Sequence, residues 1–222
     1  MDEEIRMDRE EKKTYQLEQI QALVEQSGGL VKTSDILELG IDYRRILQFM
    51  DEGYVRRVKN GYYTTTLNAG FSEEELILAM YPEGILTMES ALYCYGYLKK
   101  QPYEWSIAIS KNVSKSRFRV EYPVVKPYYT EPKVLEMGVQ EIDFAVSDAG
   151  SKDEAVHKMK IYTIDRLICD VLKYEEKMDR EDFKQALLSY IQDEGKDVGA
   201  LMEYAKERKV RKKVQTMIGV WL

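Results

Sequence analysis

The chain has 222 residues, a formal net charge of −6, and 44% hydrophobic and 32% charged residues. This balance is ordinary for a globular protein and excludes wholesale disorder, and the length predicts one or two domains. The longest apolar runs fall well short of the roughly 20 residues of a membrane helix, and the charged N-terminus lacks the apolar stretch of a signal peptide. We therefore expect a cytoplasmic protein with no membrane segment.

Basic residues gather in two segments although the chain as a whole is acidic. There are five basic and two acidic side chains between Tyr43 and Tyr63, and six basic and one acidic between Tyr204 and Val214. A net negative charge excludes a protein that coats nucleic acid over its whole surface, but a local basic face can still bind it. These two segments are therefore the candidate polyanion contacts.

Three helices are predicted in the first quarter of the chain. Apolar residues recur at helical spacing from Thr14 to Gly28, whereas residues 1–13 are nearly all charged and predict a frayed end or a loose helix start. The cluster Thr33-Ser34-Asp35 favours an N-cap for a second helix, and Asp42 can cap a third.

A β-hairpin is predicted directly after these helices. Tyr54–Val58 alternates like a strand, Asn60-Gly61 is the strongest short hairpin signal, and Tyr62–Thr65 forms the returning strand. Three helices followed by a hairpin is the order of a winged helix-turn-helix. We expect this domain at residues 14–68 and a second domain at residues 70–222.

The second domain is predicted to mix helices and strands. Ser72 and Glu75 form a capping-box pattern that begins a helix ending near Tyr81, and another helix begins near Met88. Strands are then expected at 105–109, 118–122, 124–129 and 139–146, followed by helices at 163–174, 180–192, 198–206 and 211–220. The fold class is therefore α+β: an N-terminal winged helix-turn-helix, then a mixed α/β C-terminal domain with a small sheet and several C-terminal helices.

The order of elements predicts which residues contact DNA. In a helix-turn-helix the second helix lies in the major groove, where Arg can read guanine and Gln can read adenine. The start of the preceding helix and the wing are placed to contact phosphates or the minor groove. The predicted DNA contacts are Thr33, Ser34, Tyr43, Arg44, Arg45, Gln48, Arg56, Arg57, Lys59 and Asn60. The alternative is a helical module for protein contacts whose arginines are merely solvated.

A second basic surface is predicted near the C-terminus. Val210, Val214, Met217 and Ile218 form an apolar stripe. A solvated helix face is the usual explanation for charges opposite such a stripe, and the sharper hypothesis is a second polyanion contact. The residues of this hypothesis are Lys209, Arg211, Lys212 and Lys213.

Few residues favour an enzyme. His157 is the only histidine and is expected at the surface, so nucleophilic catalysis has little support. Cys94 and Cys169 are far apart in sequence and are expected to be reduced core thiols rather than metal ligands. The chain has no glycine-rich phosphate loop. We predict no catalytic residue, no cofactor and no metal.

Two acidic patterns are the remaining enzymatic signals. Glu141 and Asp143 lie on one face of a predicted strand, but the Gly-Ser turn of nucleotidyltransferases comes after them here, at Gly150-Ser151, rather than before. Glu131-Pro-Lys133 has the spacing of some nucleases, but the proline does not fit a central strand. Both patterns are interpreted as surface charge.

Several segments resemble a known family. Gly28–Leu47 and Gly53–Tyr63 look like the N-terminal domain of the AbiEi family, bacterial antitoxins of abortive-infection, type IV toxin–antitoxin systems. The similarity continues through Ser90–Gly96, Pro102–Trp105, Ile161–Asp170, Ala186–Tyr190 and Leu201–Ala205, and so covers the chain from about residue 14 to its end. The charged N-terminal extension has no counterpart in this resemblance.

The resemblance implies a protein with two activities. Its N-terminal winged helix would repress its own operon by binding inverted repeats in promoter DNA, and its C-terminal domain would counteract a nucleotidyltransferase-like toxin without a stable complex. The family's DNA-contacting basic residues carry over only to Arg44, Arg45, Arg56, Arg57 and Lys59. Two alternatives stay open: a stand-alone regulator whose C-terminal domain senses a ligand or partner, and an enzyme fused to a DNA-binding domain.

Overall fold

A computed structural model describes residues 8–67, 70–146 and 155–221, without the side chains of 144–146 and 155–157. Its contacts divide the chain into two compact units. The N-terminal unit comprises residues up to Pro82 with Val120–Pro123 and Ala145–Ala155, and the C-terminal unit comprises the rest. The predicted domain boundary falls at residues 68–70, of which 68–69 lie outside the described residues, and it stays a prediction.

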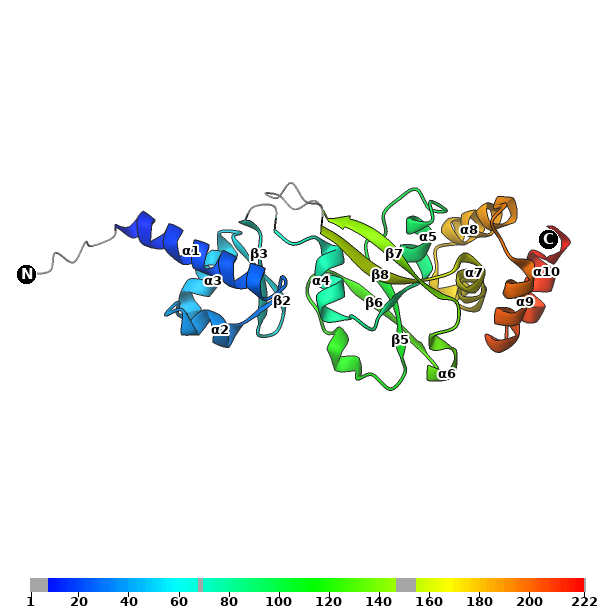
Figure 1. The fold of residues 1–222 in the computed structure, drawn as a ribbon, viewed down its shortest axis with the longest axis horizontal. Helices are drawn as coiled ribbons and strands as arrows, with labels where there is room; N and C mark the ends of the chain where they lie inside the picture. The colour runs from blue at the N-terminus through cyan, green and yellow to red at the C-terminus, as the bar shows by residue number, and fades with distance from the viewer. Residues whose placement is uncertain (1–7, 68–69, 147–154, 222) are drawn as a thin grey trace, which may run out of the picture. The chain divides into compact units, whose positions relative to one another are not determined.

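The N-terminal unit contains a helix-turn-helix-like group and an antiparallel hairpin (Figure 1). Its elements are α1 (Arg9–Gln26), β1 (Val31–Lys32), α2 (Thr33–Glu38), α3 (Tyr43–Asp51), β2 (Val55–Lys59), β3 (Tyr62–Thr65) and α4 (Glu73–Met80). The three strands form one antiparallel sheet in the order β1-β3-β2. β1 was not predicted from the sequence, and it pairs Val31 with Tyr63.

Helix α1 begins earlier than the sequence analysis expected. The Asp8 carboxylate accepts the backbone N–H groups of Glu10 and Glu11, and the Glu11 carboxylate accepts the N–H of Asp8. This capping box satisfies N–H groups that the first turn leaves without helical partners. Of the two alternatives predicted for residues 1–13, a frayed end and a loose helix start, the helix start describes the residues from Asp8 onward.

Helix α2 is capped differently from the prediction. Lys32, rather than the Thr33-Ser34-Asp35 cluster, takes the cap position, and its N–H donates to Asp35 at 3.3 Å. The reason is the pairing of β1 with the hairpin, which brings the Thr33 N–H to the Gly61 carbonyl at 2.9 Å. The predicted Asn60-Gly61 turn is present, and Gly61 has the positive φ of 76° that favours glycine.

The C-terminal unit is a mixed five-stranded sheet with helices, strand order β6-β5-β4-β8-β7. Its elements are β4 (Ile85–Leu86), α5 (Met88–Cys94), β5 (Trp105–Ser110), η2 (Lys115–Phe118), β6 (Val125–Thr130), α6 (Pro132–Leu135), β7 (Val139–Val146), β8 (Ala155–Tyr162), α7 (Ile164–Lys173), η3 (Glu175–Lys177), α8 (Arg180–Gln192), α9 (Val198–Glu207), α10 (Arg211–Met217) and η4 (Gly219–Trp221). The α+β class with several C-terminal helices is confirmed.

The strand predicted at 118–122 is wrong. Residues 115–118 form a short 3-10 helix, and the N–H groups of Glu121 and Tyr122 both donate to the carbonyl of Val58, at 2.7 and 3.2 Å. The backbone of this segment therefore bonds to the hairpin strand β2 instead of joining the second sheet.

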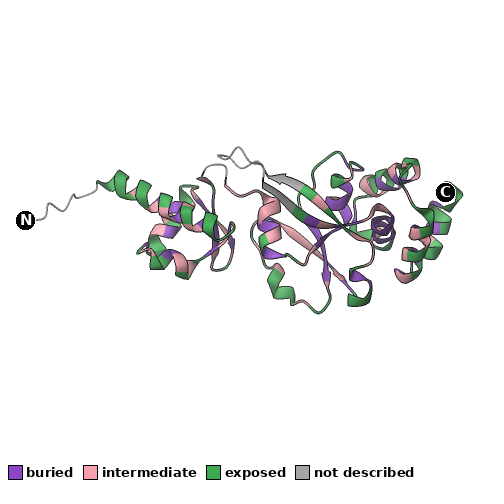
Figure 2. Cartoon of the chain, viewed as in Figure 1, coloured by how far each residue is buried: buried purple, intermediate pink, exposed green. Residues whose placement is uncertain are grey.

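Helix α7 lies at the centre of the C-terminal unit. It contacts α5, α8, α9 and α10, and Figure 2 shows it as mostly buried. Eight of its ten residues are buried, among them the charged residues Asp165, Arg166 and Asp170. This helix holds most of the segment 161–170 on which the family resemblance partly rests, so that segment has a structural role.

Two buried guanidinium groups share one buried carboxylate in this core. Arg166 lies 2.7 Å from Asp170, and the Arg208 Nε donates to Asp170 at 2.6 Å. Burial alone lowers the pKa of Arg208, but the Asp170 carboxylate more than offsets this and holds the pKa above its ordinary value. Because Arg208 follows α9, this carboxylate joins α7 to α9.

No helix among the described residues is both long and apolar enough to cross a membrane.

We predict that Asp170→Asn lowers the free energy of unfolding of the C-terminal unit by about 3–5 kcal/mol, because it leaves two buried cations without their counterion. Urea unfolding followed by tryptophan fluorescence measures this unit alone, since Trp105 and Trp221 both lie in it. The matched control is Asp143→Asn at an exposed strand position. A loss of less than about 1 kcal/mol contradicts the account.

Candidate nucleic-acid interface

Helix α3 presents one face to the core and one to solvent. The Asp42 carboxylate caps it by accepting the Arg45 N–H at 2.8 Å. Ile46 and Phe49 are fully buried, whereas Tyr43 and Leu47 are 47% and 39% exposed. Arg44 is also exposed and bonds to none of the described residues. The solvent face of α3 thus carries one cation between two large apolar groups.

Arg45 and Gln48, the other predicted DNA contacts on this side of α3, bond to neighbouring side chains, and their contact with DNA stays a prediction. The Arg45 guanidinium donates to Gln16 of α1 at 3.0 Å and to Gln48 at 2.6 Å. It also stacks on the ring of Phe49, with 4.5 Å between the guanidinium carbon and the ring centroid. Both predicted base-reading side chains are therefore occupied within the unit.

These contacts continue as a chain of polar groups between α1 and α3. Gln48 donates to Glu52 at 2.7 Å, and the Glu52 carboxylate lies 2.8 Å from the ammonium of Lys13. The hydrogen bond from Lys13 lowers the pKa of Glu52. We call the set Gln16, Arg45, Gln48, Glu52 and Lys13 the α1–α3 brace. It fixes the side chains on one flank of α3.

The two hydroxyl groups predicted to contact a phosphate have internal partners. Ser34 donates to Asp35 at 2.8 Å. The Thr33 hydroxyl hydrogen-bonds with Tyr63, and this bond by itself lowers the pKa of Tyr63. Burial of Tyr63 and its hydrogen bond with Tyr43 outweigh that effect and raise the pKa. A phosphate contact by Thr33 or Ser34 requires exchange of these bonds.

The basic side chains of the hairpin contact neighbouring residues. Arg57 bonds to the Glu121 carboxylate at 2.9 Å, and Arg56 stacks over the Tyr122 ring at 4.2 Å. Lys59 lies 4.3 Å from the ring centroid of Tyr62, next to the exposed Asn60 at the turn. The hairpin tip is thus the part of the predicted wing that is most available to a ligand.

Two basic residues near this surface were missed by the sequence analysis. Arg9 and Lys12 of α1 line a hollow of about 280 Å³ together with Gln16, Asp42 and Arg45. They fall in residues 1–13, for which the sequence predicts a frayed end or a loose helix start. The capping-box spacing of Asp8 and Glu11 was the signal that would have placed them on a helix.

One residue of the second predicted basic surface, Lys213, has partners inside the unit. The Lys213 ammonium bonds to Glu175 at 2.7 Å and to the Leu172 carbonyl at 2.9 Å, and so ties α10 to the end of α7. Lys209, Arg211 and Lys212 are exposed. Three of the four predicted residues are therefore at the surface.

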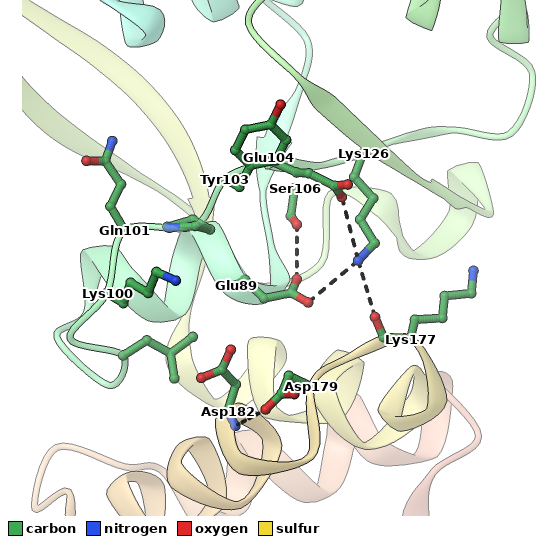
Figure 3. A pocket seen from close by; sticks show the side chains of 12 residues that line it. Glu89, Lys100, Gln101, Tyr103, Glu104, Ser106, Lys126, Lys177, Asp179 and Asp182 are labelled. Atoms are coloured by element: carbon green, nitrogen blue, oxygen red, sulfur yellow. Dashed lines mark hydrogen bonds and ion pairs between the residues drawn. The ribbon is translucent and has the colours of Figure 1, made fainter.

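The C-terminal unit has a mixed-charge cleft of about 560 Å³ (Figure 3). On its floor Ser106 donates to Glu89 at 3.1 Å, and Lys126 lies 3.6 Å from the same carboxylate. Burial, followed by the carboxylates of Asp179 and Glu89, raises the pKa of Asp182 on the opposite wall. The cleft therefore offers both signs of charge to a small polar ligand.

The residues considered for catalysis are dispersed. Exposed Glu141 lies 3.3 Å from Lys158. Glu131 and Lys133 make ion pairs with different partners, at 2.7 Å with Lys111 and at 3.7 Å with Glu207 respectively. The side chain of His157 lies outside the described residues. Within the described part of the chain, no cluster of three or more His, Cys, Asp or Glu is arranged to hold a metal ion.

The two cysteines differ in environment. Cys169 is buried, and burial raises the pKa of its thiol to about 12, as befits an inert core group. Cys94 is exposed at the end of α5. The prediction of two core thiols is therefore wrong for Cys94.

Comparison with protein families recovers the N-terminal part of the chain. Residues 18–66, from within α1 to the end of the hairpin, match the family model described as "Transcriptional regulator, AbiEi antitoxin". By this similarity, residues 18–66 form an AbiEi-type domain. The match supports the family suspected from the sequence and associates these residues with antitoxin transcriptional regulators. No curated protein matches the chain.

We predict that Arg45→Ala loosens the AbiEi-type domain, whereas Arg44→Ala does not. Arg45 loses two hydrogen bonds and a stacking contact, at a cost of about 1 kcal/mol or more, while exposed Arg44 contributes less than about 0.5 kcal/mol. Hydrogen exchange of the α1 and α3 amides, read by mass spectrometry, compares the two neighbouring variants. Equal exchange rates in both variants contradict the brace.

Proposed function

We propose that this protein is the antitoxin of a type IV, abortive-infection toxin–antitoxin system, and that it represses its own operon by binding inverted repeats in the promoter. The observation that carries the proposal is the exposed Arg44 face of α3 inside a domain matching the AbiEi transcriptional-regulator model. The resemblance of the downstream segments extends the proposal to the rest of the chain.

The geometry of the N-terminal unit supports the proposal of DNA binding. As a winged helix-turn-helix, it would place α3 in the major groove and the hairpin beside it as the wing. Arg44 would reach base edges, and Lys59 and Asn60 would contact the backbone or the minor groove. Arg56 would contact a phosphate only after leaving the ring of Tyr122, and Arg57 only after leaving the carboxylate of Glu121. The exchange costs little for Arg57, because an exposed ion pair contributes little net stability.

The C-terminal unit is proposed to neutralise the toxin without catalysis. The partner implied by the resemblance is a nucleotidyltransferase-like toxin, and no stable complex is required. Exposed Lys209, Arg211 and Lys212 supply a surface that can contact a polyanion on which such a toxin acts. No cofactor or metal enters this proposal.

A second candidate function is a stand-alone regulator whose C-terminal unit senses a ligand. The cleft around Glu89, Lys126 and Asp182 favours it, because a concave site with a few polar groups is the usual form of a small-molecule site. A toxin gene beside this gene separates the two candidates in favour of the first.

We predict specific binding to the DNA immediately upstream of its own gene. In mobility-shift titrations, Arg44→Ala is expected to weaken binding about tenfold, because an arginine that contacts a base contributes about 1–3 kcal/mol. Arg180→Ala, an exposed arginine of α8, is the matched control. Affinity should fall steeply between two salt concentrations. Absence of binding at low salt reduces the domain to a protein-contact module.

We predict that the wild-type chain and Arg44→Ala both restore growth to cells that express the neighbouring toxin, because neutralisation does not use the DNA face. Charge reversal of Lys209, Arg211 and Lys212 to Glu should abolish the rescue, whereas Lys184→Glu should not. If the triple reversal changes neither rescue nor DNA affinity, the second polyanion contact is refuted. DNA binding without any rescue favours the ligand-sensing regulator.

A further inference from the structure

The solvent face of α3 contains an apolar side chain that the fold does not use. Leu47 is 39% exposed, although its neighbour Ile46 and the nearby Phe49 are completely buried. Single exposed leucines are common on protein surfaces and need no explanation by themselves. Leu47, however, lies three residues after Arg44 and four after the exposed Tyr43, so these three side chains share one stretch of the helix surface.

The α1–α3 brace leaves this stretch as the reading surface. Arg45 and Gln48, the other candidates for base contacts, bond to Gln16 and to Glu52 respectively. Asp51 places a negative charge at the C-terminal end of α3, which disfavours a close approach to phosphates there, whereas the Glu52 carboxylate is paired with Lys13. The N-terminal half of the helix, with Tyr43, Arg44 and Leu47, is therefore the half that fits the groove.

The chemistry of the major groove supplies a partner for Arg44 and a partner for Leu47. Arginine pairs with the two acceptors of guanine, and the 5-methyl group of thymine is the apolar group on the base edges. A leucine side chain makes no hydrogen bond, so packing against a methyl group costs no hydrogen bond. Packing against the edge of another base would leave a donor or acceptor of that base without a partner.

We infer that Leu47 determines operator specificity by packing against a thymine methyl group, beside a guanine read by Arg44. The inference rests on the proposed function, since it requires that α3 enters the major groove. The operator feature that the domain recognises is then a thymine and a guanine within one half-site. The two bases lie as far apart as Leu47 and Arg44, which are about one turn apart on α3.

The test removes a single methyl group from the DNA. Each thymine of the DNA upstream of the gene is replaced in turn by deoxyuridine, which keeps base pairing and lacks only the 5-methyl group. For the wild-type protein, one replacement per half-site should weaken binding about fourfold, the value of about one buried methyl group. Leu47→Ala should weaken binding to unmodified DNA by a similar factor and lose sensitivity to that replacement.

Leu188→Ala, at an exposed leucine of α8, is the matched control and should keep the sensitivity of the wild type. If wild type and Leu47→Ala respond equally to every replacement, the thymine contact is refuted while DNA binding stands. If the wild type binds none of this DNA at low salt, the proposed function fails and the inference fails with it. Because Leu47 is exposed, circular dichroism should show an unchanged fold for the variant.

Discussion

Burial of Ile46 and Phe49 is the constraint on which the N-terminal site depends. These two side chains fix which face of α3 meets the core, and therefore which face meets solvent. The α1–α3 brace then leaves fewer side chains available on the solvent face, because the Arg45 guanidinium donates to Gln16 of α1. A short amphipathic helix with four candidates for DNA contact thus presents chiefly Arg44 at its surface, with Tyr43 and Leu47 beside it. Specificity in such an arrangement comes from shape and methyl contacts as much as from hydrogen bonds.

The same principle, a charged group held by its neighbours, operates at two other places. In the C-terminal unit, Asp170 joins α7 to the end of α9 through two buried arginines, and this rigid centre supports the surrounding helices. At the hairpin, Glu121 holds Arg57 in an exposed pair of small net stability. The first pair is structural because its members are buried. The second can be exchanged for a phosphate at little cost, so the proposed DNA binding by the hairpin would compete with a contact inside the unit.

The sequence predicted the elements whose signals are local. Helical spacing, the Asn60-Gly61 turn and the Ser72 capping box each depend on a few neighbouring residues, and the structure contains all three. It could not predict β1, since two residues become a strand only by pairing with Tyr62 and Tyr63. Nor could it foresee that Arg45 turns toward α1, that Lys213 bonds to the end of α7, or that Arg208 is buried, because each depends on residues between 29 and 41 positions away. Composition and periodicity do not predict which charged side chains pair over such long sequence distances.

The solvent face of α3 is the surface proposed to contact DNA. Hydroxyl-radical footprinting of the full chain, with and without the DNA upstream of its gene, tests it at side-chain level. Tyr43 and Leu47 are exposed and oxidisable, and so are Tyr103 and Leu188 of the C-terminal unit, which serve as internal references. The account predicts that DNA lowers the oxidation of Tyr43 and Leu47 and leaves the references unchanged. Bound DNA that leaves Tyr43 and Leu47 as reactive as before would contradict it.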